Sequence, residues 1–220
     1  MILKYLQRWW YSRQCRDQAI KRYYDAPWPR LSTGFSECRF LVVDLETTDL
    51  SAQQGEVASI AWVAVARGEI QMSSSEYHLV QLENNVGQSA VYHQLHDQDL
   101  IEASKVTSIL ERFLEAAAGS VLVFHHASLD MAFLNKLSSA IYGVPLCAIV
   151  ADTLELEKRK LTRQGRMIEQ GALRLFSCRE RYHLPVYPAH NAFMDALATA
   201  ELFLAYAANQ GAEPVLGDFV

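Results

Sequence analysis

The chain has 220 residues, half of them hydrophobic and a fifth charged, with a net charge of −5. This composition excludes an intrinsically disordered chain, because such chains lack the apolar surface that offsets the entropy of ordering. The net charge conceals a basic start, since residues 1–39 carry eight Lys and Arg against three Asp and Glu.

Features that would place the chain in a membrane or an oxidising compartment are missing from the sequence. No apolar run reaches the roughly 18 residues that a membrane-spanning helix needs, and the first residues lack the apolar stretch of a secretory signal. The four Cys are scattered without a CxxC pair, which is typical of reduced thiols. We therefore expect a cytoplasmic protein that does not contact membranes.

The N-terminal part, residues 1–38, is predicted to be a basic and aromatic helical extension followed by a linker. Residues 2–24 contain no Gly or Pro and are compatible with a helix. The prolines in 26–29 end any helix, because proline lacks an N–H and its ring clashes with the preceding turn. Residues 32–37 have the composition of a linker.

Residues 39–210 are predicted to form one domain, with a short tail at 211–220. Strand-like segments occur at 40–43, 56–67, 69–80, 121–124 and 146–150. Helical patterns occur at 103–118, 129–141, 168–179 and 191–208. In the last of these, Phe193, Leu197 and Leu204 lie on one predicted apolar stripe. This order indicates an α/β fold, in which a mixed sheet is flanked by helices.

Acidic residues recur where the predicted strands end and helices begin. Asp44 and Glu46 follow the run at 40–43, and their i, i+2 spacing places both carboxylates on one face of a strand. Asp130 follows the predicted buried strand at 121–124. It lies in the first turn of a helix that Ser128 is expected to cap. Taken alone, each position is better explained as an ordinary strand end or helix start than as a functional site.

A third acidic position opens the last predicted helix, where Asp195 follows His190 by five residues. The three acidic positions are expected to converge on one edge of the sheet. Hard oxygen ligands of this kind suit Mg²⁺ or Mn²⁺ rather than zinc.

Three motifs in this order resemble those of the DEDDh (DnaQ-like) exonuclease family. They are Asp-Leu-Glu-Thr-Thr at 44–48, His-His-Ala-Ser-Leu-Asp at 125–130, and the His190 and Asp195 pair. Smaller matches fall at 59–60, 91–95 and 152–154. His190 indicates the histidine branch of the family, because the tyrosine branch has Tyr where Asn191 stands. Asp49 departs from the usual glycine, which affects only the geometry of the turn.

The resemblance covers about 39–209 and implies a ribonuclease H-like fold with 3′→5′ exonuclease activity, similar to the proofreading subunit of bacterial DNA polymerase III. The implied reaction releases nucleoside monophosphates from single-stranded DNA ends with two Mg²⁺ or Mn²⁺ ions. The implied metal ligands are Asp44, Glu46, Asp130 and Asp195. His190 is the implied general base, and the implied substrate contacts are Leu45, Thr47, Thr48 and Phe193.

Two other functions stay open at this point. The motifs do not distinguish DNA from RNA, so an exoribonuclease that trims RNA 3′ ends is an alternative. A noncatalytic nucleic-acid-binding module associated with a polymerase is another. The short tail leads us to expect an enzyme that stands alone, or one that is tethered to a polymerase or to a second copy through its N-terminus.

Two basic regions have competing interpretations. The first forms either a phosphate-binding rim beside the acidic centre or an ordinary solvated face, and its members are Lys158, Arg159, Lys160, Arg163, Arg166, Arg174, Arg179 and Arg181. The N-terminal extension either binds nucleic acid through its cations and rings, or packs through the stripe of Leu3, Leu6 and Trp10 on the domain or on a second copy.

Overall fold

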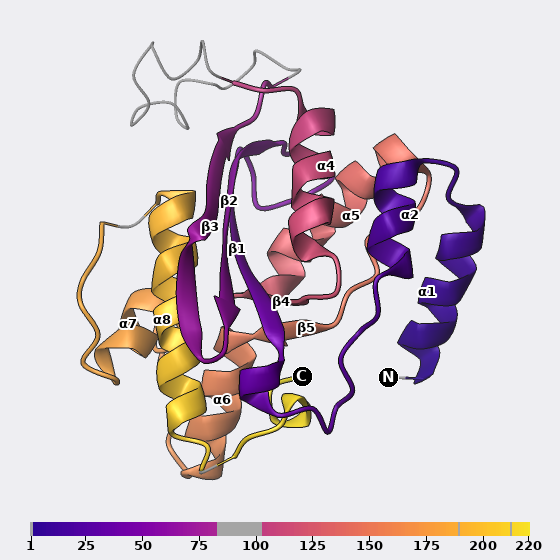
Figure 1. The fold of residues 1–220 in the computed structure, drawn as a ribbon. Coiled ribbons are helices and arrows are strands. Elements are labelled where there is room, and N and C mark those ends of the chain that lie inside the picture. The colour runs from indigo at the N-terminus through magenta and orange to yellow at the C-terminus, as the bar shows by residue number, and fades with distance from the viewer. Residues whose placement is uncertain (1, 83–102, 189, 212) are drawn as a thin grey trace.

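The computed structural model describes residues 2–82, 103–188, 190–211 and 213–220. Its centre is a five-stranded sheet in the order β3-β2-β1-β4-β5 (Figure 1). The strands are β1 (Arg39–Thr47), β2 (Val57–Ala66), β3 (Glu69–Leu79), β4 (Val121–Phe124) and β5 (Val150–Asp152). The sheet is mixed, because β1 pairs antiparallel with β2 and parallel with β4.

Helices cover both faces of this sheet. They are α1 (Ile2–Gln14), α2 (Gln18–Asp25), α4 (Val106–Ala117), α5 (Ala127–Tyr142), α6 (Thr153–Arg163), α7 (Leu175–Glu180) and α8 (Ala192–Ala208). Phe203 of α8 packs on Phe40, while Phe113 of α4 packs on Trp62, which is the cross-strand partner of Val43. Since side chains alternate along a strand, α8 and α4 lie on opposite faces.

Both faces being covered explains the continuous apolar runs that the sequence shows. β4 is buried along its whole length, and β1 is buried from Phe40 to Val43 before its exposure rises. The ribonuclease H-like mixed sheet flanked by helices, predicted from the sequence, is confirmed. In the part of the chain that the structure describes, no helix has the length and apolarity to cross a membrane.

The N-terminal extension is helical, as expected, but consists of two helices rather than one. The chain breaks at Cys15, and the carboxylate of Asp17 accepts a hydrogen bond of 2.8 Å from the N–H of Ala19 to start α2. Asp is a favoured N-cap, which explains the break inside a run without Gly or Pro. α2 buries Ile20 and Tyr23 and packs against α4.

Several predicted boundaries are wrong. Residues 146–149 are buried but lie outside the sheet, which they join only at Val150. The helix predicted at 168–179 is reduced to α7, and α6 precedes it unpredicted. The segment 32–37 contains the 3₁₀ helix η1 (Phe35–Glu37) and buries Phe35. The predicted match at 91–95 lies outside the described residues.

The C-terminal residues pack against the domain. A 3₁₀ helix, η4 (Leu216–Asp218), follows the end of α8, and Gly34 forms an isolated β-bridge with Val215. The ring of Phe219 lies 5.0 Å from that of Phe35 and 5.4 Å from that of Phe203. Aromatic pairs at these distances stabilise a core beyond the area they bury.

Candidate active site

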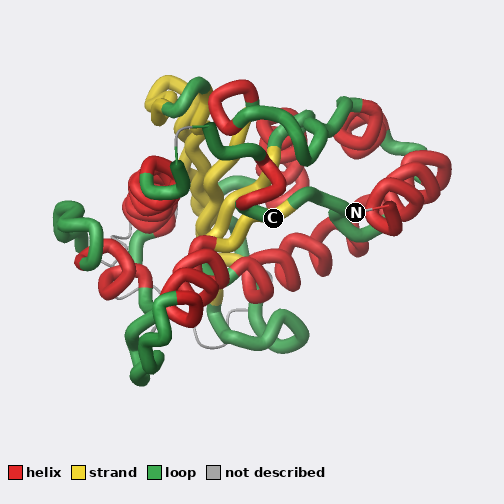
Figure 2. Tube along the Cα trace, turned by 90° about the horizontal axis from the view of Figure 1, so that it is seen from below, coloured by secondary structure: helices red, strands yellow, loops and turns green. Residues whose placement is uncertain are grey.

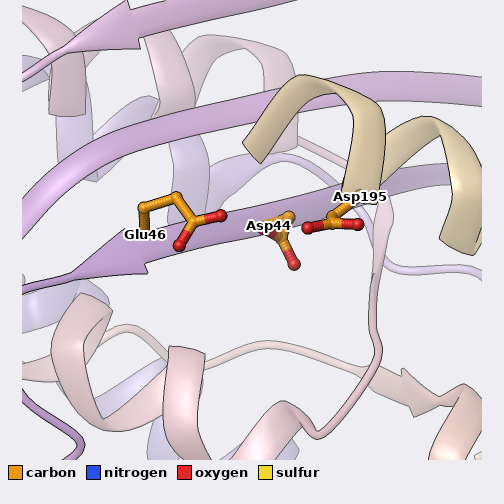
Figure 3. Close-up of side chains that lie close together, drawn as sticks. All are labelled: Asp44, Glu46 and Asp195. Atoms are coloured by element: carbon orange, nitrogen blue, oxygen red, sulfur yellow. The ribbon is translucent and has the colours of Figure 1, made fainter. Parts of the chain in front are cut away.

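Three carboxylates meet where β1 ends and α8 begins (Figure 3). Asp44 and Glu46 point to the face of the sheet that α8 covers, as the alternation from Phe40 requires. Asp195 lies in the first turn of α8. One oxygen of each carboxylate lies within 4.8 Å of the others. The convergence of these three residues is confirmed.

Small residues allow α8 to approach the sheet at this point. Ala61 of β2 is the cross-strand partner of Asp44, and it packs against Ala192 and Ala196 in the first turns of α8. Larger side chains at these positions would hold the helix away from the strand, because interiors are close-packed. Three alanines therefore set the distance between Asp195 and Asp44.

Burial raises the pKa of every carboxylate in this group, and repulsion between the acids adds to the effect at Asp44 and Glu46. Burial raises the pKa of Asp44 well above its usual value, and the charges of Asp130, Asp195 and Glu46 raise it further. Burial also raises the pKa values of Glu46 and Asp195. Among the described residues, none of the three forms an ion pair with Lys or Arg. Such a group gains a great deal from an added cation.

Asp130 stands beside these three residues but outside their group. It lies in the first turn of α5, is buried, and raises the pKa of Asp44 through its charge. Burial raises the pKa of Asp130 itself to about 7, although the backbone N–H groups of Asp130 and Leu45 donate hydrogen bonds to its carboxylate. Asp130 therefore lies near enough to act on Asp44 through its charge, although its oxygens do not join the group of three.

The start of α5 is held by Asp152 rather than by Ser128, so the predicted cap is wrong. The Asp152 carboxylate accepts hydrogen bonds from the N–H groups of His126 at 3.0 Å, Ala127 at 2.9 Å and Leu154 at 3.0 Å. His126 has a φ of 83°, which places it before the helix, and Ser128 is already inside it. Asp152 therefore fixes the turn that carries Asp130.

His190 lies just before α8, beside the acidic group. Its backbone N–H donates a hydrogen bond of 3.0 Å to Asp195, and its φ of 67° is in the left-handed region. Its charge lowers the pKa of both Asp195 and Glu46, against the larger effect of burial. The imidazole thus lies within electrostatic range of two of the three clustered carboxylates.

The loop after Glu46 is closed by hydrogen bonds. The N–H of Thr48 donates to the carbonyl of Glu56 at 3.0 Å, and the N–H of Glu56 donates to the Thr48 hydroxyl at 2.9 Å. Asp49 is not in the left-handed region, and its carboxylate accepts from Ser51 at 2.7 Å. An Asx turn of this kind explains why Asp replaces the usual glycine.

The two apolar residues predicted to contact substrate lie differently. Phe193 is partly buried beside Ala61, Ala192 and Ala196. Leu45 packs against the main core, on the face of the sheet opposite to Asp44 and Glu46. Their contacts with substrate, like those of Thr47 and Thr48, stay predictions.

A groove of about 390 Å³ that the sequence analysis missed adjoins Asp195. Phe176 of α7, which is 55% exposed, lies in its wall with Val186 and His183. An aromatic ring this exposed beside a cluster of carboxylates is a candidate stacking platform. No spacing rule signals it, because α7 is only six residues long.

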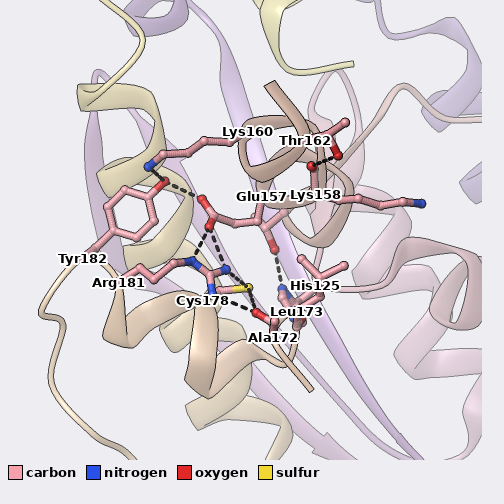
Figure 4. A network of polar contacts seen from close by, with 11 residues as sticks. His125, Glu157, Lys158, Lys160, Thr162, Ala172, Leu173, Cys178, Arg181 and Tyr182 are labelled. Carbon is pink, nitrogen blue, oxygen red and sulfur yellow. Dashed lines mark hydrogen bonds and ion pairs between the residues drawn. The ribbon is translucent and has the colours of Figure 1, made fainter. Parts of the chain in front are cut away.

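Three members of the predicted basic rim, Lys160, Arg179 and Arg181, make internal contacts, and two of these contacts belong to the network in Figure 4. Arg181 donates to buried Glu157 at 2.8 and 3.0 Å, Lys160 donates to Tyr182 at 2.8 Å, and Arg179 pairs with Glu201 at 2.7 Å. Two exposed members, Arg159 and Arg163, line a pocket with Gln210 and Asp218, beyond the far end of α8 from Asp195. Lys160, Arg179 and Arg181 therefore serve internal contacts, and phosphate binding by the exposed members of this region stays a prediction.

The donor set fits a hard divalent cation. Carboxylate oxygens are the ligands that Mg²⁺ and Mn²⁺ prefer. Partly buried carboxylates with no Lys or Arg partner among the described residues are stabilised by an added positive charge. A ribonuclease H-like sheet with this cluster at the end of β1 defines the class of nucleases that cleave phosphodiesters with metal ions. The chain belongs to the exonuclease family RNase T, whose family model matches residues 41–203.

Curated relatives include DNA polymerases III of the PolC type. The chain is 27% identical over 176 residues to the protein from Thermotoga petrophila, a match that covers 79% of this chain and 12% of that protein. It is 28% identical over 173 residues to a Staphylococcus aureus protein, covering 76% of this chain and 11% of the relative. The chain thus spans about an eighth or less of these relatives' length.

Solved structures with the same fold include cell-death related nuclease 4, at a TM-score of 0.64 and 17% identity, covering 82% of this chain and 66% of that one. Exonuclease I matches at a TM-score of 0.65 and 14% identity, and the match covers 79% of this chain and 41% of that one. Exonuclease X, in complex with 5′ overhanging duplex DNA, matches at 0.58 and 21% identity, with coverages of 80% and 95%. These similarities establish the DnaQ-like exonuclease fold.

Proposed function

We propose that this chain is a 3′→5′ exonuclease of the DEDDh type that releases nucleoside monophosphates from single-stranded DNA ends. The observation that carries the proposal is the group formed by Asp44, Glu46 and Asp195, whose oxygens lie within 4.8 Å of one another and make no ion pair with a Lys or Arg among the described residues. A repair or proofreading role would follow from such an activity.

The four carboxylates are proposed to hold two Mg²⁺ or Mn²⁺ ions. Asp44 lies at the centre of the group and would contact both sites, because the charges of Asp130, Asp195 and Glu46 all act on it. Glu46 and Asp195 would complete one site and Asp130 the other. Two such ions would supply charge neutralisation and Lewis-acid activation of the phosphodiester.

His190 is proposed as the general base that accepts the proton of the attacking water. Imidazole suits this role because its ordinary pKa lies close to neutral pH. The hydrogen bond from its backbone N–H to Asp195 at 3.0 Å keeps it at the edge of the acidic group. The proton would leave to solvent, since His190 is exposed.

The terminal nucleotide is proposed to lie against the backbone of Thr47 and Thr48, with its base near Phe193 or Leu45. The groove beside Asp195 would hold the next base, which could stack on Phe176. A double helix keeps its bases stacked on each other, so an exposed ring in this groove favours a single strand.

Matched DNA and RNA oligonucleotides with a label at either end test the proposal. We expect single-stranded DNA to shorten stepwise from its 3′ end in Mg²⁺ or Mn²⁺, and this activity to stop in excess chelator. Preferred cleavage of RNA would assign the chain to the RNA-trimming alternative. Binding without cleavage at any metal concentration would support the noncatalytic module.

A His190→Ala variant separates the proposed base from a metal ligand. We expect the rate at saturating metal to fall by roughly 10²–10⁴, the usual contribution of a general base, and the acidic limb of the pH–rate profile to disappear. Calorimetric metal affinity should be nearly unchanged. A variant that loses metal affinity but recovers its full rate at high metal would show that His190 is a ligand.

A further inference from the structure

Helix α1 presents its apolar side to solvent. Leu3, Leu6, Trp9 and Trp10 are 67%, 60%, 56% and 55% exposed, respectively. Leu3, Leu6 and Trp10 follow one another at spacings of three and four, so they lie on one face of the helix. We call this face, formed by Leu3, Leu6, Trp9 and Trp10, the outer face. Figures 1 and 2 both place α1 at the periphery of the molecule.

The inner face of α1 is polar and is fixed to the domain. The Arg8 guanidinium is buried and donates to the carbonyls of Tyr24 at 3.0 Å, Tyr23 at 2.9 Å and Ala26. It also lies 4.2 Å from the ring of Trp28. Leu6 lies two residues before Arg8, which places the two side chains about 200° apart around the helix. Because Arg8 is held against the domain, the outer face points away from it.

This arrangement changes both interpretations of the extension. The predicted stripe does not pack on its own domain, since all of its members are exposed. The aromatic residues Tyr23 and Tyr24 are buried, and the Lys4 ammonium donates to the carbonyl of Ala148 at 3.2 Å. Part of the cations and rings that a nucleic-acid-binding arm needs are therefore turned toward the domain.

The charges on the outer face favour a neutral, apolar occupant. Of the three cations in α1, Lys4 and Arg8 turn inward, and Arg13 lies 4.2 Å over the ring of its own Trp9. An anionic lipid surface or a phosphate backbone would be met by a single outward cation. A second copy of the same apolar face needs no cation for binding.

We propose that the outer face of α1 is the interface through which two copies of this chain associate. Four large side chains that are more than half exposed offer on the order of 500 Å² of apolar surface, and two copies together reach about 1,000 Å², the lower bound for a specific interface. A twofold axis is the commonest symmetry for such pairs.

An antiparallel pairing of the two helices accommodates Arg13. Leu3 of one copy then faces Trp10 of the other, and the Leu6 side chains lie next to the twofold axis. The two Arg13 residues are separated by about 15 Å or more along the helix axis, which exceeds the screening length at physiological salt. The pairing leaves the carboxylate group free, because α1 lies beyond α2 and α4, on the opposite side of the sheet from α8.

Light scattering of the full chain over a wide concentration range tests the pairing. We expect a dimer, and we expect Leu6→Glu to raise its dissociation constant by about 30-fold or more, the effect of losing one hot-spot side chain. The exonuclease rate should be unchanged in Leu6→Glu, and its melting temperature should match that of the wild type at concentrations low enough for both proteins to be monomeric. Met72→Glu, which alters an exposed apolar residue of β3, is the matched control and should remain dimeric.

A monomer at all concentrations, or a dimer that persists in Leu6→Glu, would overturn the proposal. So would binding of phosphatidylglycerol vesicles or of a thymidine oligonucleotide that is lost on Trp10→Ala, since it would assign the outer face to lipid or to nucleic acid. For the orientation, Leu6→Cys is expected to form a disulfide between copies and Leu3→Cys is not. Cross-linking by Leu3→Cys alone would contradict the antiparallel pairing.

Discussion

Two regions of this protein bury carboxylates in opposite ways. Glu157 is fully buried, but Arg181 donates to it at 2.8 and 3.0 Å and the Tyr182 hydroxyl donates to its other oxygen (Figure 4). Asp44, with Glu46 and Asp195 beside it, has no such partner among the described residues.

The presence or absence of an internal partner distinguishes a carboxylate that supports the fold from carboxylates that are expected to bind a ligand. An acid that is matched by an internal cation and a hydroxyl can stay ionised without help, and removing it leaves the partner unpaired. Acids that are buried together without a cation destabilise the fold, so their presence indicates a ligand that neutralises them. This contrast supports the proposal that the acidic group at the end of β1 binds metal ions, whereas the Glu157 network is part of the scaffold.

The largest effect is expected from Asp44→Asn. It should lower the exonuclease rate by about 10³-fold or more, because the metal contribution to phosphodiester cleavage amounts to several kcal/mol. In excess chelator the variant should melt at a higher temperature than the wild type, since one repelling charge is removed. An active variant, or one that is inactive because it is unfolded, would contradict this assignment.

Glu157→Gln is expected to have the opposite pattern, with lower stability and an unchanged rate. It leaves the half-buried Arg181 guanidinium without its anion and the buried amide only partly satisfied, which costs about 1–3 kcal/mol of unfolding free energy, or a fall of roughly 5 °C in melting temperature. The rate per folded molecule at saturating metal should be retained. Glu155→Gln is the control on the same helix, because its pair with Lys158 at 3.0 Å is exposed and such pairs contribute at most about 1 kcal/mol.

The comparison also predicts how stability depends on pH without metal. Burial raises the pKa of Asp130 from 3.8 to about 7, so the folded state binds more protons than the unfolded state between these values. The unfolding free energy should therefore fall as the pH rises from about 4 to about 7, by at most about 4 kcal/mol, and then level off.

Asp130→Asn should remove this part of the pH dependence, which denaturant titrations in chelator would measure as the difference between variant and wild type. The difference should be smallest near pH 4 and largest above pH 7. A difference that does not change with pH would show that the Asp130 carboxyl titrates normally. Saturating Mg²⁺ should reduce the difference at high pH, because the ions neutralise the same charge.

Much of the acidic site could be predicted from the sequence. The i, i+2 spacing of Asp44 and Glu46 places both side chains on one face of a strand, independently of the rest of the fold. Asp195 could be predicted because the first turn of a helix favours a carboxylate. The apolar runs at 40–43 and 121–124 identify the central strands, since few other structures bury a continuous run.

The remaining features depend on contacts between distant segments. On α8 the predicted stripe of Phe193, Leu197 and Leu204 is only partly buried, and Thr199 and Phe203 face the core instead. Ala-rich helices give no strong periodicity, so the contact with the sheet decides the orientation. Similarly, counting basic residues between 158 and 181 could not reveal that Arg181 is paired with Glu157 from another helix.

The smallest effect is expected where the two regions meet, on α7. Cys178 of this helix contacts Arg181 in the Glu157 network at 3.1 Å, while Phe176 lines the groove beside Asp195. If the network holds α7 so that Phe176 can stack on a base, then Phe176→Ala should weaken binding of a single-stranded oligonucleotide by about 1–3 kcal/mol, or roughly 5- to 150-fold.

Fluorescence anisotropy with a labelled thymidine oligonucleotide, in Ca²⁺ to prevent cleavage, would measure this loss. Phe176→Tyr keeps the ring and should bind like the wild type, and the melting temperature of Phe176→Ala should change little because the side chain is 55% exposed. Hydrolysis of a thymidine monophosphate ester, which has no second base, should be unaffected in both variants. Equal loss of ester hydrolysis and oligonucleotide binding would show that Phe176 supports the acidic group rather than the strand, and the groove would then belong to the scaffold.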